Sequence, residues 1–138
     1  MKRPILRGKV IRGADRGKHL GFPTANLDIP SQALPKTGVY AVWVRVEAED
    51  RWRPGAAHVG YNRTFDEKVK KLEVHLLEFS GDLYGKTLEI IPVRHLRDEE
   101  RYESADVLIR QMQRDCRTAA QLLASTSTPS PPPSVKQP

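Results

Sequence analysis

The stretch GVYAVWVRVE, residues 38–47, carries the clearest strand pattern in the chain. Every second residue from Tyr40 to Val46 is Tyr or Val, and these side chains fall on one side of an extended backbone. Trp43 and Arg45 fall on the other side. A period of two predicts a β-strand with one face in an apolar core.

Similar patterns lie on both sides of this stretch. Residues 71–79 alternate again, with apolar side chains on one face and Glu73 on the other. Pro92 suggests a sheet edge or a strand end, because proline cannot donate a ladder hydrogen bond. Further strands are expected at residues 5–12, after Asn26, and at residues 56–60 and 86–93.

The pattern changes near the C-terminus. Ser104 is a suitable helix N-cap, and Asp106 stands in the first turn. Apolar residues then recur at helical spacing, at Leu108, Met112, Cys116, Ala119 and Leu123. Five or six short strands followed by one amphipathic helix predict a mostly β protein, namely a small antiparallel barrel with the helix packed outside it.

The last residues have a different composition. Residues 125–138 read STSTPSPPPSVKQP, which is dominated by Ser, Thr and Pro. Such a segment buries too little apolar surface to offset its ordering entropy. We therefore expect one domain over residues 1–124 and a disordered tail over residues 125–138.

Bulk composition narrows the class of protein. One cysteine in 138 residues leaves no partner for an intramolecular disulfide, which fits a reducing compartment. No apolar run resembles a signal peptide or a membrane span, so a cytoplasmic protein is expected. The formal net charge of +6 favours polyanionic partners, either nucleic acid or a nucleoside triphosphate, but does not choose between them.

The segment GADRGK, Gly13–Lys18, invites comparison with phosphate-binding loops. It departs from the P-loop pattern, because one residue is missing between the glycines and His19 stands where Ser or Thr would bind magnesium. A basic loop whose backbone amides and Lys18 face phosphates is one interpretation. A solvated turn is the other.

The segment GFPTAN follows at residues 21–26. In an extended chain Thr24 and Asn26 project to the same side, where a hydroxyl and a carboxamide oxygen suit Mg²⁺. A turn that caps the next strand is the alternative. The neighbouring Gly-Lys loop favours a nucleotide site.

Glu73 shares a strand face with His75, opposite the apolar row. If that face lines a cleft, Glu73 is placed to accept a proton from a substrate hydroxyl during phosphoryl transfer. A solvent-facing glutamate is the ordinary alternative. We interpret His75 as structural, since two candidate ligands do not make a zinc site.

These motifs together resemble the riboflavin kinase family, whose members occur alone or as the kinase module of bifunctional FAD synthetases. The resemblance runs from Ile5 to Leu123. Its signature is GFPTAN, supported by RGKVIRGADRGKHLG, VGYNRTF, LEVHLLEFSGDLYGK and LRDEERYESADVLIRQMQRD. It implies a six-stranded antiparallel Greek-key barrel with a C-terminal helix. The implied activity is transfer of the ATP γ-phosphoryl group to the riboflavin 5′-hydroxyl, giving FMN and ADP.

The resemblance also implies roles for individual residues. Glu73 matches the catalytic base, and Thr24 and Asn26 match the ligands of Mg²⁺, with Mn²⁺ or Zn²⁺ left open. The remaining matches are nucleotide positions at Gly13, Lys18, Gly21, Pro23, Leu76, Glu78 and Tyr84, and flavin positions at Arg97 and Tyr102. Two places depart from the family: Arg63 stands for a usual proline, and Asp98 and Arg101 stand for a usual proline and lysine.

The expected partners are riboflavin and ATP, with a monomeric protein, no membrane and no nucleic acid. A basic small barrel that binds nucleic acid is the main alternative. Against it, aromatic residues make up only 7% of the chain, too few to suggest a base-stacking face. A non-catalytic flavin-binding protein is a second alternative, which the presence of Glu73, Thr24 and Asn26 disfavours.

Overall fold

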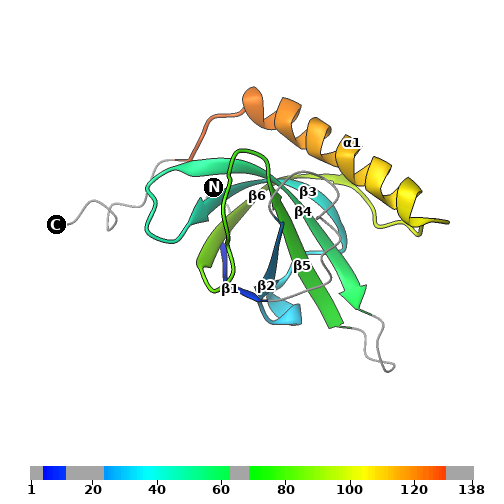
Figure 1. The fold of residues 1–138 in the computed structure, drawn as a ribbon, viewed down its shortest axis with the longest axis horizontal. Coiled ribbons are helices and arrows are strands. Elements are labelled where there is room, and N and C mark those ends of the chain that lie inside the picture. The colour runs from blue at the N-terminus through cyan, green and yellow to red at the C-terminus, as the bar shows by residue number, and fades with distance from the viewer. Residues whose placement is uncertain (1–4, 12–23, 63–68, 130–138) are drawn as a thin grey trace.

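The computed structural model describes residues 5–11, 24–62 and 69–129. Within them, antiparallel strands close into a barrel in the order β1-β2-β5-β4-β3-β6 (Figure 1). The strands are β1 (Leu6–Ile11), β2 (Thr24–Asp28), β3 (Gly38–Val46), β4 (Trp52–Asn62), β5 (Val69–Leu76) and β6 (Thr87–Arg97), and the helices are the short 3-10 helix η2 (Ser31–Ala33) and α1 (Ala105–Ala124).

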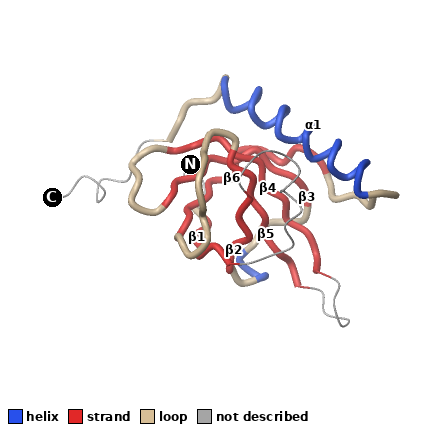
Figure 2. Tube along the Cα trace, in the orientation of Figure 1, coloured by secondary structure: helices blue, strands red, loops and turns tan. Residues whose placement is uncertain are grey.

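The strand order is that of a Greek key. β3, β4 and β5 pair consecutively, and β6 returns to lie beside β3. The predicted fold class is therefore confirmed, and α1 lies across the outside of the barrel (Figure 2).

The barrel interior is filled by one alternating set of side chains. From β3 it receives Tyr40, Val42, Val44 and Val46, the row predicted from the sequence. Leu72, Val74 and Leu76 of β5 and Ala25 and Leu27 of β2 join them. Because side chains alternate along a strand, the intervening residues of β2, β3 and β5 face outward.

The outer face of β3 and β4 forms a second apolar cluster with the C-terminal half of α1. Trp43 and Ala56 of the sheet pack there with Cys116, Ala119 and Leu123 of the helix. Burial raises the pKa of the Cys116 thiol to about 12. Ser104 caps α1, because its hydroxyl accepts a hydrogen bond from the Val107 amide at 3.2 Å. This agrees with the predicted helix start.

Two strands differ from the sequence prediction. β4 is longer than residues 56–60, and Pro54 fits within it because the β5 ladder begins only at Gly55. Pro92 is not at a strand end. It lies inside β6 beside a register shift against β3, beyond Ile90, where the pairing with β1 stops. Among the described strands, β6 pairs beyond Ile90 with β3 alone, so its other side is a sheet edge. Proline is tolerated there, because a residue at a bulge on a sheet edge does not need to donate a ladder hydrogen bond.

The segment after the helix is only partly described. α1 ends at Ala124, and residues 130–138 lie outside the described residues, so disorder of the tail stays a prediction. Of the helices in the described ranges, none has the length and apolar character needed to cross a membrane.

Candidate active site

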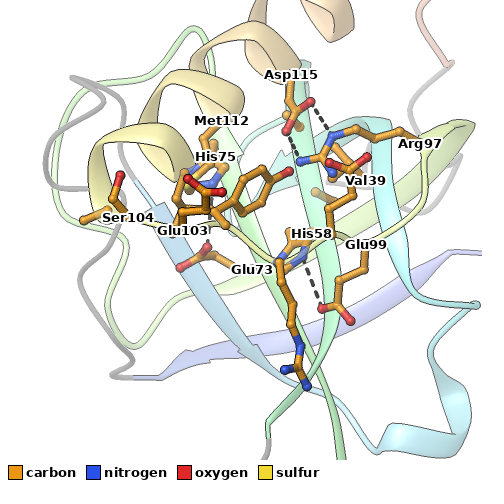
Figure 3. Close-up of a pocket in the computed structure, with 17 residues that line it drawn as sticks. Val39, His58, Glu73, His75, Arg97, Glu99, Glu103, Ser104, Met112 and Asp115 are labelled. Carbon is orange, nitrogen blue, oxygen red and sulfur yellow. Dashed lines mark hydrogen bonds and ion pairs between the residues drawn. The ribbon is translucent and has the colours of Figure 1, made fainter.

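A cavity of about 530 Å³ lies between the outer face of the sheet and the N-terminal half of α1 (Figure 3). Its floor includes Ala56, Glu73 and His75, and its roof includes Leu108 and Met112 of the helix. Residues 99–104, which join β6 to α1, close one side. The same helix is therefore seated on the sheet along its C-terminal half and stands over a cavity along its N-terminal half.

Strand register sets a row of five side chains across this face. Asn26 pairs with Glu73, Glu73 with His58, His58 with Val39, and Val39 with Arg97. Directly opposed residues of an antiparallel pair share a face, with Cβ atoms about 4.5–5.5 Å apart. The register thus brings the predicted Asn26 and Glu73 side by side, although they are 47 positions apart in sequence.

Glu73 and His75 are both buried against the cavity. Glu73 is 5% exposed and His75 is 4% exposed. The Nε2 atom of His75 lies 3.7 Å from the Oε1 atom of Glu73. The sequence predicted that these residues share a face, and the structure agrees. Across β2, Thr24 pairs in register with His75, which also shows that Thr24–Asn26 is strand rather than turn.

Arg97 joins the end of β6 to the helix above the cavity. Its Nε and Nη2 atoms donate to the two carboxylate oxygens of Asp115 at 2.9 and 2.7 Å. Gln111 also donates to Asp115, at 3.0 Å. The hydrogen bond from Arg97 to Asp115 raises the pKa of the arginine further. Arg97 therefore ties the helix to the sheet as well as lining the cavity.

Tyr102 packs beside this pair, in the connection between β6 and α1. The Arg97 guanidinium lies 5.8 Å from the centre of the tyrosine ring. Burial raises the pKa of Tyr102, and the nearby guanidinium opposes that rise. The hydroxyl is buried without a well-formed hydrogen bond to any described residue. An aromatic ring with a spare donor suits the wall of a ligand pocket.

His58 and Glu99 close the opposite side of the cavity (Figure 3). Their Nε2 and Oε2 atoms are 3.5 Å apart, and both side chains are partly exposed. Gly60 permits this approach, since a Cβ atom at that position would lie 2.1 Å from the Glu99 carboxylate. Glycine on β4 thus leaves room for the side chains of His58 and Glu99 to meet.

Three predicted nucleotide residues lie away from the cavity. Leu76 is buried inside the barrel, where its side chain belongs to the apolar core. Glu78 is exposed and lies 3.3 Å from Arg51, and Tyr84 is also exposed. Their assignment stays a prediction. The predicted positions Gly13, Lys18, Gly21 and Pro23 lie outside the described residues.

The sequence reasoning missed Asp115, His58 and Glu99 as cavity residues. Asp115 could have been found from the sequence, because it lies three positions after Met112 and four before Ala119, within the apolar stripe of the helix. An acid in such a stripe needs a partner. No local pattern in the sequence indicates His58 and Glu99, because their proximity depends on strand register and on the path of the β6–α1 connection.

The residues present fit a hard divalent cation better than a zinc ion. In the described ranges, no three His, Cys, Asp or Glu residues are grouped to hold a metal. Asn26 instead offers a carboxamide oxygen on the face that carries Glu73. Mg²⁺ needs only one or two protein oxygens, because water and substrate phosphates complete its octahedron.

Comparison with known proteins identifies the family of the chain. The family model described as riboflavin kinase matches residues 1–123. The bifunctional riboflavin kinase/FMN adenylyltransferase of Escherichia coli (strain K12) is 37% identical over 121 residues, which cover 88% of this chain and 38% of that relative. The chain thus spans well under half of the length of this curated relative.

Solved structures show the same likeness. A structure titled as a macrolide-efflux protein from Streptococcus pneumoniae matches with a TM-score of 0.74 and 33% identity, over 86% of this chain and 38% of that one. Riboflavin kinase from Trypanosoma brucei matches with a TM-score of 0.60 and 26% identity, over 88% of this chain and 80% of that one. By its family match, its barrel and its cavity, the chain belongs to the riboflavin kinase family.

Proposed function

We propose that this chain transfers the γ-phosphoryl group of ATP to the 5′-hydroxyl of riboflavin, giving FMN and ADP. The observation that carries the proposal is the position of Glu73. Glu73 is buried in the outer-face row, between Asn26 and His58, and lines a cavity of about 530 Å³. Ligand pockets of small molecules have volumes of about 300–1,000 Å³, so the cavity suits a flavin.

The cavity supplies the features that the acceptor requires. Leu108 and Met112 offer apolar surface to a flat ring, and the Tyr102 hydroxyl is available as a polar anchor. The Arg97–Asp115 pair holds the helix over the sheet, so the pocket keeps its shape before substrate binds. In this proposal Arg97 and Tyr102 lie on the flavin side.

Glu73 acts as the base. The riboflavin hydroxyl is neutral before reaction, and its proton passes to the Glu73 carboxylate as its oxygen bonds to the γ-phosphorus. The bond between that phosphorus and the bridging oxygen breaks, and ADP leaves with the electron pair. Burial of Glu73 keeps competing water away from the transfer.

Thr24 and Asn26 are proposed to hold Mg²⁺, although Mn²⁺ or Zn²⁺ are alternatives. When bound, the metal neutralises charge on the phosphates. The register that puts Asn26 beside Glu73 supports the placement of this site next to the base. Gly13, Lys18, Gly21 and Pro23 are proposed to bind the nucleotide, together with Leu76, Glu78 and Tyr84.

The proposal is limited to the kinase step. The curated relative is named for a second activity, FMN adenylyltransferase, and this chain spans only 38% of its length. We propose a monomeric, cytoplasmic protein whose substrates are riboflavin and ATP and which binds neither nucleic acid nor membrane.

Incubation of the purified chain with riboflavin and Mg-ATP tests the proposal, with FMN and ADP separated by chromatography. We expect both products in equal amounts, and neither when ATP is replaced by a non-hydrolysable analogue. No FMN under these conditions would overturn the proposal. Tight polynucleotide binding that weakens steeply with salt would instead support the nucleic-acid-binding alternative.

A further inference from the structure

His75 is the buried polar group nearest to Glu73 on its own strand. The two residues are two positions apart on β5 and share its outer face. Their Nε2 and Oε1 atoms are 3.7 Å apart, and neither side chain is more than 7% exposed. In register, His75 lies opposite Ala56 of β4, whose small side chain leaves room for the imidazole ring.

A base in phosphoryl transfer requires a fixed orientation. A glutamate side chain has several rotatable bonds, and a misplacement of about 1 Å can cost about 10²-fold in rate. The distance of 3.7 Å between Nε2 and Oε1 exceeds that of a good hydrogen bond by several tenths of an ångström, so the inferred contact requires the two side chains to move closer by that amount.

We propose that His75 is a positioning residue for Glu73: Nε2 of the imidazole holds Oε1 of the carboxylate and leaves the other oxygen for the substrate hydroxyl. His75 donates no proton to the reaction and takes none from it. The inference rests on the proposed function of Glu73, and it replaces the purely structural role expected from the sequence.

The other histidine beside Glu73 is a poorer candidate. His58 lies opposite Glu73 on β4, but its Nε2 atom lies 3.5 Å from the carboxylate of Glu99, and its side chain is 28% exposed. His75, by contrast, is buried and close to the Glu73 carboxylate itself.

A double-mutant cycle tests the inference. We would measure kcat and the KM for riboflavin in the wild type, His75→Leu, Glu73→Gln and the double variant. If His75 acts through Glu73, His75→Leu lowers kcat about 10- to 100-fold with little change in KM. The double variant is then no slower than Glu73→Gln alone, because residues that act as a unit give non-additive losses.

Three further variants distinguish a loss of positioning from a folding defect. Gln places an amide donor near the position of Nε2, so His75→Gln should recover most of the lost kcat, whereas His75→Asn, which is too short to reach Oε1, should not. His95→Gln is the matched control, since His95 lies on β6 with its Nε2 atom 3.3 Å from the Thr37 carbonyl. It should keep wild-type kcat.

The outcomes separate the two proposals. Losses that multiply in the double variant, a change in KM alone, or wild-type kcat in both His75→Leu and His75→Asn would overturn the role of His75. Full activity in Glu73→Gln would instead remove the base itself, and the proposed mechanism with it.

Discussion

Glu73 and Glu89 are two buried glutamates on the outside of the same barrel, and their surroundings differ. Glu73 is 5% exposed and Glu89 is 6% exposed. Each lies in register between two neighbouring strands: Glu73 between Asn26 and His58, and Glu89 between Arg7 and Arg45. Both arginines form ion pairs with Glu89.

Under the proposed function, the difference separates a structural carboxylate from a catalytic one. Both carboxylate oxygens of Glu89 accept hydrogen bonds, one from Arg7 and one from Arg45. These bonds link β6 to its two neighbouring strands, β1 and β3. Glu73 is bordered by an amide and two imidazoles and lines a cavity large enough for a ligand. Burial alone therefore does not distinguish the two glutamates, whereas their cross-strand neighbours do, and these neighbours support the role proposed for Glu73.

The largest expected effect is on catalysis by Glu73→Gln. The amide keeps the size of the side chain but cannot accept the hydroxyl proton, so kcat should fall by about 10² to 10⁴. The free energy of unfolding should change little, because no arginine is left without its partner. Steady-state FMN formation and urea unfolding of the same preparation measure both quantities.

Glu89→Gln is the matched control for that variant, with equal burial and the same substitution. If Glu89→Gln lowered kcat as strongly as Glu73→Gln while remaining folded, the distinction between the two carboxylates would be lost.

The second effect is on stability and belongs to Glu89→Gln. The substitution removes the negative charge with which both Arg7 and Arg45 pair, and it leaves the largely buried Arg45 without that charge. The free energy of unfolding should therefore fall by about 1–3 kcal/mol. Activity at saturating substrate should stay near that of the wild type. An unchanged urea midpoint would contradict the structural role of the ion pairs between Glu89 and its two arginines.

A smaller effect is expected in acid. Burial raises the pKa of Glu89, but the hydrogen bonds from Arg7 and Arg45 outweigh it, and the net pKa lies below the ordinary value of 4.5. As pH falls below 4.5, the unfolded chain takes up this proton first, and the stability contributed by the ionised group is lost towards the folded-state pKa.

Urea unfolding of wild type and Glu89→Gln at neutral pH and at several values below 4.5 measures this contribution. The difference in free energy of unfolding between the two proteins should shrink as the pH falls. A difference that stays constant would show that Glu89 is not held ionised by its arginines.

The sequence predicted the elements better than their pairing. The alternation of β3 and the stripe of α1 reflect burial on one face, which is a local pattern. Pro92 correctly indicated a sheet edge but not its position inside β6, because the bulge there is fixed by the register against β3, and no local pattern encodes that register.

The same limit applies to the site. Glu73 and Asn26 were singled out from the local sequence and from the family resemblance, but their adjacency follows from the pairing of β2 with β5. Apolar residues flank both Glu73 and Glu89, so the alternation of apolar and polar residues alone does not distinguish the two glutamates. Only the barrel shows which of them meets arginines and which meets a cavity.

A crystal structure with riboflavin and Mg-ADP tests the central claim most directly. The account predicts the flavin ring between the outer face of the sheet and the N-terminal half of α1. It also predicts the 5′-hydroxyl oxygen within about 2.6–3.2 Å of a Glu73 carboxylate oxygen. A flavin bound outside this cavity, or one whose 5′-hydroxyl lies far from Glu73, would contradict it.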